Sequence, residues 1–292
     1  MKKLFYHALL FLMIFLGTAA MKSDKPAYQF FDAQGKKADY KDVVKAALES
    51  DVVFFGEQHN NPIDHWLQLE LSKALIGERQ GMVVMGAEMF ETDNQLLLDE
   101  YLGGRIKKNN FKEEARLWKN YNTDYEPLVE LAKSNGIPFI ATNIPRRYAA
   151  VVNKSGFEGL DSLSDEARAY IAPLPIAYDP ELKGYKDMLE MMGGQGGHAS
   201  ANLPKAQAAK DATMAHFISR NWLAGKIFIH FNGTYHSDNF QGILWYLKRE
   251  RPQLRILTIS SVEQPDIDEL SEEGAGLADF ILCTPESMTK TN

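Results

Sequence analysis

Six short apolar runs, separated by longer amphipathic stretches, constrain the fold more than any other feature of this 292-residue chain. The runs cover residues 51–55, 82–85, 137–141, 226–231, 254–259 and 278–283. None alternates strictly between apolar and polar residues, which is typical of strands that are covered on both faces. Strands that alternate with helices predict parallel pairing through right-handed crossovers. The expected fold class is therefore α/β, with a three-layer parallel sheet and helices on both faces.

Helix signals fill the gaps between these runs. Asn61-Pro62 has the pattern of an N-cap followed by proline at the first helical position. A second helix is predicted over 124–134, because Asn135-Gly136 is a typical helix end. A third is predicted over 238–249, before Pro252.

The region from about 146 to 222 departs from this rhythm because it holds no convincing strand. Helical stretches are predicted at 164–171, 181–192 and 204–222. We interpret it as a helical insert subdomain packed over one edge of the sheet, within a single domain that spans residues 21–292.

The first twenty residues have the pattern of a secretory signal. Lys2 and Lys3 precede an apolar run over 4–16, and small residues follow at 17–20. The chain is therefore expected to be exported, to the periplasm or the cell envelope, with an uncleaved anchor as the alternative. The single cysteine, Cys283, lies far from this segment, so no lipobox cysteine is present for a lipid anchor.

Charge and cysteine content exclude two classes of protein. The formal net charge of −7 argues against binding to a phosphate backbone, and no nucleic acid partner is expected. One cysteine cannot form an intramolecular disulfide scaffold.

Polar side chains follow four of the apolar runs. Ligands of doubly wound sheets bind beyond the carboxyl ends of the strands, so these residues should meet at one edge. They are Glu57, His59, Glu88, Asn143, Arg146, Arg147, Tyr235 and His236. Apart from the two arginines, they are good ligands for iron or a divalent metal, or partners that orient such ligands.

Each residue alone also has a structural interpretation. Glu57 and Glu88 could cap the following helices, and Gly56, Gly86 and Gly233 could serve only as tight turns. His65 and His216 fall on predicted helices as surface or structural residues, and His230 is expected to be a satisfied core histidine. Convergence favours a site, because burying several carboxylates together is costly without a cation or a protonated partner.

A family resemblance rests on these same residues. The segments are Gly56–Pro62 with His65, Glu88–Phe90, 137–147, 207–215 and the late Gly233-Thr234-Tyr235-His236. Together they resemble the ChaN family of haem-binding uptake proteins in the Tiki superfamily, which also includes TraB-like proteins and erythromycin esterases. The resemblance covers roughly residues 28–285. It implies an exported haem-binding protein of haem or iron acquisition, with an outer-membrane uptake system as partner.

Haem requires an apolar slot, an axial ligand and cations for its propionates. Tyr235 or a nearby histidine could ligate the iron, and Arg146 and Arg147 could bind the propionates. The cofactor-binding candidates are Tyr235, His236, His59, Arg146, Arg147 and Asn143. An exposed macrocycle would favour a homodimer that covers it.

Two alternatives remain open. The first is a metal-dependent hydrolase, a peptidase or esterase, with Glu57, His59, Glu88 and His236 as catalytic groups. The same four residues and Tyr235 would then be the candidate ligands of a divalent metal ion. The second alternative is a non-catalytic binding domain in which the strand-end residues are only structural.

Overall fold

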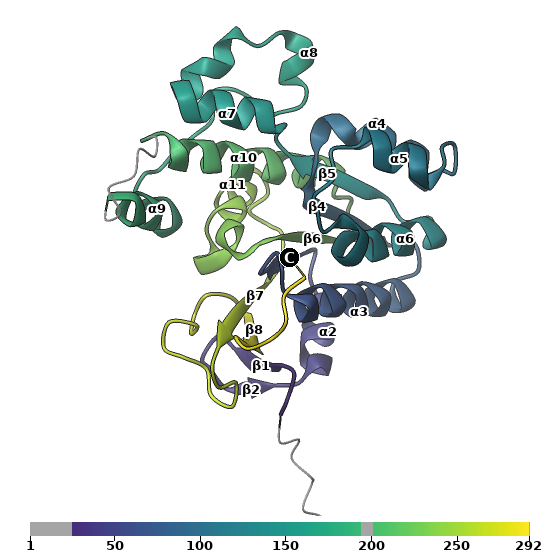
Figure 1. The fold of residues 1–292 in the computed structure, drawn as a ribbon, viewed down its shortest axis with the longest axis vertical. Coiled ribbons are helices and arrows are strands. Elements are labelled where there is room, and N and C mark those ends of the chain that lie inside the picture. Colours follow the sequence, from purple (N-terminus) through teal and green to yellow (C-terminus); the bar gives the residue numbers. More distant parts are fainter. Residues whose placement is uncertain (1–24, 194–200, 292) are drawn as a thin grey trace, which may run out of the picture.

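The computed structural model describes residues 25–193 and 201–291 (Figure 1). The predicted signal segment at 1–20 lies outside these residues. Within the described ranges, no helix is long and apolar enough to cross a membrane.

All six apolar runs form strands. These are β3 (Val52–Glu57), β4 (Val83–Glu91), β5 (Phe139–Asn143), β6 (Ile227–Gly233), β7 (Ile256–Gln264) and β8 (Phe280–Pro285). They pair in parallel in the order β8-β7-β3-β6-β4-β5, which confirms the predicted parallel sheet.

An antiparallel hairpin, β1 (Gln29–Asp32) and β2 (Lys37–Ala38), extends the sheet beyond β8. The sequence analysis did not predict it, because segments of four and two residues carry little periodic signal.

The alternation of side chains along β3 explains the three layers. Val53 and Phe55 belong to the core on one face, while Val52 and Phe54 belong to the core on the other. The first face is covered by α2 (Tyr40–Leu48), α3 (Pro62–Glu78), α4 (Gln95–Leu102), α5 (Lys108–Glu114) and α6 (Glu126–Asn135). The second is covered by α7 (Arg146–Ser155), α10 (Leu203–Asn221) and α11 (Ile243–Glu250) (Figure 1).

Local signals set the ends of the helices. The Asn61 side chain accepts the N–H of Ile63 at 3.0 Å and caps α3, and Gly136 ends α6 with φ of 62°. The predicted helix at 238–249 starts only at Ile243. Asn239 and Phe240 both have φ of 57°, and such left-handed residues cannot continue a right-handed helix.

Between β5 and β6 the described residues form helices and turns and no strand. They include α7, η3 (Phe157–Ser162), α8 (Asp165–Arg168), α9 (Lys183–Gly193) and α10. Helix α8 is one turn long and ends at Arg168, so it is shorter than predicted. Helix α10 packs on β4 and β5, whereas an insert with boundaries at about 146–222 stays a prediction.

Candidate functional site at the carboxyl edge of the sheet

The strand ends bring the predicted carboxylates and histidines to one edge of the sheet. Glu57 ends β3, Glu88 lies in β4, Asn143 ends β5 and His236 follows β6 in the turn η4 (Thr234–His236). Their exposed fractions are only 1%, 4%, 8% and 4%. Several ionisable groups are therefore buried together, so their partners decide their charge.

Glu57 is held by three hydrogen-bond donors. Its carboxylate lies 2.9 Å from Nδ1 of His59, and it accepts from Tyr125 at 2.7 Å and from Gln68 at 2.6 Å. His65, on α3, is buried 3.6 Å from the same carboxylate. Burial opposes protonation of His59, but Glu57 and nearby Glu88 outweigh it, and the pKa of His59 is raised. We call Glu57, His59, Gln68 and Tyr125 the Glu57 cluster.

His236 lies between two buried carboxylates. Its Nδ1 is 2.5 Å from Asp211 and its Nε2 is 3.2 Å from Glu88, while Tyr185 donates to Asp211 at 2.7 Å. Burial opposes the charged ring, yet Glu88 and Asp211 together raise the pKa of His236 to about 9. Burial also opposes ionisation of Glu88, but His236 holds the Glu88 pKa below its usual range. These four residues, the His236 cluster, therefore contain a buried imidazolium.

Gly233 allows the two clusters to approach each other. Its N–H donates to Glu88 at 2.9 Å. A Cβ at this position would lie 2.8 Å from the His59 ring and 3.6 Å from Glu88. His59 and Glu88 therefore share the space that only glycine leaves open.

The three glycines do not serve as turns, contrary to one interpretation of the sequence. Gly56, Gly86 and Gly233 lie in β3, β4 and β6, and none has a positive φ. Their role is close packing: a Cβ on Gly86 would lie 2.8 Å from the buried ring of Phe228.

Two residues beside the clusters have different roles. Asn143 donates to the Glu88 carbonyl at 2.9 Å, while its buried Oδ1 has no hydrogen-bond partner among the described residues. His230 is fully buried and contacts Thr142 at 2.8 Å and Asn232 at 3.0 Å, which confirms it as a core histidine. Burial lowers its pKa to about 4.

Arg146 and Arg147 line a cavity of about 1050 Å³, which we call the arginine cavity. Its other walls include Glu91, Arg116, Trp118 and Asn120. Arg147 is 2.5 Å from Asp93, and Arg116 pairs with Asp93 and Glu91. Arg146 is exposed and forms no ion pair with any residue in the described ranges.

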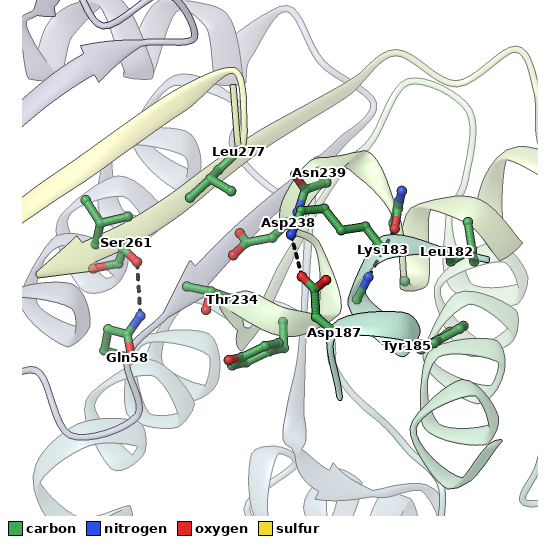
Figure 2. A pocket seen from close by; sticks show the side chains of 15 residues that line it. Gln58, Leu182, Lys183, Tyr185, Asp187, Thr234, Asp238, Asn239, Ser261 and Leu277 are labelled. Atoms are coloured by element: carbon green, nitrogen blue, oxygen red, sulfur yellow. Dashed lines mark hydrogen bonds and ion pairs between the residues drawn. The ribbon is translucent and has the colours of Figure 1, made fainter. Parts of the chain in front are cut away.

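Tyr235 lines a different cavity of about 340 Å³, which we call the aspartate cavity (Figure 2). Its other walls include Gln58, Lys183, Asp187, Asp238 and Ser261. The Tyr235 side chain is 59% exposed. The structure thus separates Tyr235 from the two arginines, which the sequence had grouped at one site.

The loop after β3 lies between the two cavities. Gln58 faces the aspartate cavity, while the His59 ring contacts Trp118 of the arginine cavity at 4.9 Å between ring centroids. Asn120 of the arginine cavity also donates to the His59 carbonyl at 2.9 Å.

The structure gives no support for the divalent-metal alternative. Within residues 25–193 and 201–291, no group of three or more His, Cys, Asp or Glu side chains is arranged to hold a metal ion. The reason is that Glu57 is bound by its own donors, and Glu88 by His236 and the Gly233 N–H.

Several residues of the site were missed as individual candidates. Asp211 lies on α10 within the 207–215 segment that carried the family resemblance, and this was the one signal for it. Gln68, Tyr125, Arg116 and Trp118 were missed as well, because they lie on helices and loops and not at the strand ends. Their side chains reach the edge only after the helices pack on the sheet.

Comparison with known proteins identifies the family. Residues 43–247 match the family described as haem-binding uptake, Tiki superfamily, ChaN. The chain belongs to the ChaN family. The predicted resemblance is therefore confirmed.

Two relatives of this ChaN-family chain differ in how much of it they cover. A solved structure titled as cofacial haem binding to ChaN of Campylobacter jejuni is 18% identical, with a TM-score of 0.66 over 87% of this chain and 96% of that one. This likeness confirms the fold. The protein RETICULATA-RELATED 5, chloroplastic, of Arabidopsis thaliana is 28% identical over 141 residues, 46% of this chain. The match spans 19% of that relative's length.

Proposed function

We propose that this protein binds haem in the arginine cavity. The observation that carries the proposal is the combination of a large cavity with three guanidinium groups. Its volume of about 1050 Å³ is at the upper end of ligand cavities, and Leu117, Trp118 and Ala150 give it apolar surface. Membership in a family of haem-binding uptake proteins supports the same ligand.

The arginines fit the propionates of haem. Arg146 is free of ion pairs with the described residues, and it offers a planar set of donors to a carboxylate. Arg147 and Arg116 are already held by Asp93, so their positions are fixed before a ligand arrives. Such preorganisation reduces the entropy that binding loses.

Two residues are the candidates for the axial ligand. His59 contacts the wall of the arginine cavity, and its side chain is 44% exposed. Tyr235 offers an exposed phenol on the other side of the loop after β3. His236 is a poor candidate, because both of its ring nitrogens already face carboxylates.

Haem titration tests the proposal. Purified protein is titrated with haemin, and the Soret band is followed in the wild type and in His59→Gln, Tyr235→Phe and His216→Gln. We expect saturation near one equivalent for the wild type and for His216→Gln. The variant that lacks the axial ligand should show a shifted Soret band. A wild-type protein without saturable binding would refute the proposal.

Export and iron acquisition form the wider part of the proposal. The basic and apolar pattern of residues 1–20 supports export, and the family supports a role in haem or iron uptake. A homodimer that covers the haem and an outer-membrane uptake system are the partners we propose. Cell fractionation with and without residues 2–20 tests export, and light scattering with and without haem tests the dimer.

Acid–base hydrolysis is a second candidate function. The specific observation is the His59–Glu57 pair: Glu57 orients the ring through Nδ1, which leaves Nε2 on the side of Glu88. A histidine oriented in this way can accept a proton from water and return it to a leaving group. Peptide or ester bonds are the substrates that the superfamily resemblance implies.

A substrate screen tests this second candidate. A panel of peptide and ester substrates is assayed with wild type, Glu57→Gln, His59→Gln and the control His216→Gln. We expect any activity to fall at least about 100-fold in the first two variants and to stay unchanged in the control. Wild-type protein that cleaves nothing on the panel counts against hydrolysis and leaves the haem proposal standing.

A further inference from the structure

The aspartate cavity enters the functions proposed above only through Tyr235, and its chemistry differs from that of the arginine cavity. It is bounded by the turn η5 (Asp238–Phe240), the start of α9 and the edge of β7. We propose that this cavity binds a small organic cation, a primary ammonium compound, with Asp238 as its counter-ion.

Asp238 is the group that determines the charge of the ligand. Its carboxylate accepts a hydrogen bond from Ser260 at 2.5 Å. It forms no ion pair with any residue of the described chain. Figure 2 shows the Asp238 carboxylate on the side of Thr234 and Ser261, turned away from the helix that carries Tyr185. A carboxylate placed in this way lacks a cation that the protein itself supplies.

The lysine of the cavity cannot fill that role. Lys183 forms an ion pair with Asp187 one helical turn further along α9 (Figure 2). This pair neutralises itself and leaves the Asp238 carboxyl without a cationic partner among the described residues. Burial raises the pKa of Asp238 to about 7, and a bound cation would offset that loss of solvation.

The neighbouring wall offers acceptors for an ammonium group. The Gln58 side-chain nitrogen donates to the Ser261 carbonyl at 3.1 Å, which directs its oxygen to the other side of the amide (Figure 2). With the Asp238 carboxylate and the Tyr235 hydroxyl, the cavity can satisfy the three N–H donors of a primary ammonium.

The size of the cavity limits the ligand. A volume of about 340 Å³ is at the lower end of small-molecule sites, so it suits a short-chain amine and is too small to enclose a macrocycle. Haem is placed in the arginine cavity, and the two proposals share only the Tyr235 hydroxyl.

The experiment uses n-butylammonium chloride as the probe, with 1-butanol and sodium butyrate as neutral and anionic controls of similar length. Binding to the full chain is measured by calorimetry and by amide chemical shifts. We expect saturable binding of butylammonium, at least tenfold stronger than that of either control, with shifts at Gln58 and Tyr235. Asp238→Asn, which keeps an acceptor for Ser260, should weaken binding at least tenfold.

A matched control is Asp165→Asn, which removes an equal charge from the exposed start of α8 and should leave binding unchanged. Butanol that binds as well as butylammonium would overturn the proposal in favour of a neutral ligand. Wild-type protein that binds no probe, or shifts confined to other surfaces, would also overturn it. The wild-type measurements decide the matter even if Asp238→Asn does not fold.

Discussion

The arginine cavity and the aspartate cavity lie on either side of the loop after β3, yet they differ in charge and size. One has a volume of about 1050 Å³ and presents Arg116, Arg146 and Arg147. The other has a volume of about 340 Å³ and presents Asp238. The larger cavity suits an anionic, partly apolar ligand, and the smaller one suits a small cation.

Under these two proposals, one edge of a parallel sheet holds two sites, with a partition of buried clusters between them. The Glu57 cluster and the His236 cluster together form this partition. Its carboxylates are matched by the His236 imidazolium and by hydrogen-bond donors, so its polar groups are satisfied. The ligand chemistry is therefore set by residues at the two outer walls.

The largest expected effect on stability comes from Glu88→Ala, which disrupts the ion pairs of the His236 cluster. The substitution removes one of the two carboxylates that compensate the His236 imidazolium. Removing one partner of a buried pair costs about 3 kcal/mol or more of unfolding free energy. Urea denaturation measures it. The control Glu70→Ala breaks an exposed pair with Lys73 and should cost less than about 1 kcal/mol. Equal losses in both variants would contradict the role given to the partition.

The charge contrast is tested by the double variant Arg146→Gln, Arg147→Gln. Each lost charge-assisted hydrogen bond is worth about 1.5 kcal/mol, so haem affinity should fall about 100-fold. Butylammonium affinity should not change. Arg255→Gln is the control, because Arg255 pairs with Asp51 at the opposite edge of the sheet. A double variant that keeps full haem affinity would place the haem elsewhere.

The pH dependence of stability tests the charge state of the partition. The pKa of His236 is raised to about 9 in the folded protein, above its unfolded value of about 6.5. Its contribution is therefore complete below about pH 6.5 and is lost as the pH rises through 9. Between pH 7 and 10 this loss of unfolding free energy should be about 2.5 kcal/mol. Urea denaturation should show it in wild type and His216→Gln but not in His236→Gln.

At acid pH the stability changes with pH in the opposite direction, because Glu88 is a carboxyl group with a lowered pKa. The Glu88 pKa lies below its usual range, so its contribution to stability is present above about pH 4.3 and is lost as the pH falls.

For the alkaline range, a wild-type stability that stays constant from pH 7 to 10 would mean that His236 is neutral in the folded state.

The smallest expected effect comes from Gly233→Ala. The new Cβ would lie 2.8 Å from the His59 ring, so the ring must move away from the strand. We expect the free energy of unfolding to fall by about 1 kcal/mol and the His59 resonance to shift in NMR spectra. Gly77→Ala is the matched control. A Cβ at Gly77 meets nothing within 4 Å, and alanine favours a helix more than glycine does. Gly77→Ala should therefore raise the free energy of unfolding by up to about 1 kcal/mol. A gain at both positions would contradict the tight contact.

Much of the fold could be predicted because buried strands leave a direct signal. The run at 51–55 became β3, and its side chains enter both cores. The hairpin β1–β2 could not be predicted in the same way, since its short strands owe their pairing to β8. The start of α11 depended on two left-handed residues that no periodicity reveals.

The candidate site was predicted in location better than in composition. Parallel strands deliver their carboxyl ends to one edge, so Glu57, Glu88 and His236 could be grouped from the sequence alone. Asp211 and Gln68 could not, because a polar residue on a helix is ordinary until its partner is known.

The sequence by itself determined that this protein is a parallel α/β protein of the ChaN family with polar groups at the carboxyl edge. Apolar runs and strand-end residues are local, and their consequences follow from chain order. Only the tertiary structure decided that Tyr235 and Arg146 line separate cavities and that His236 lies between two carboxylates. The physical reason is that such contacts join segments from different helices and loops, and their packing fixes which charges are buried together.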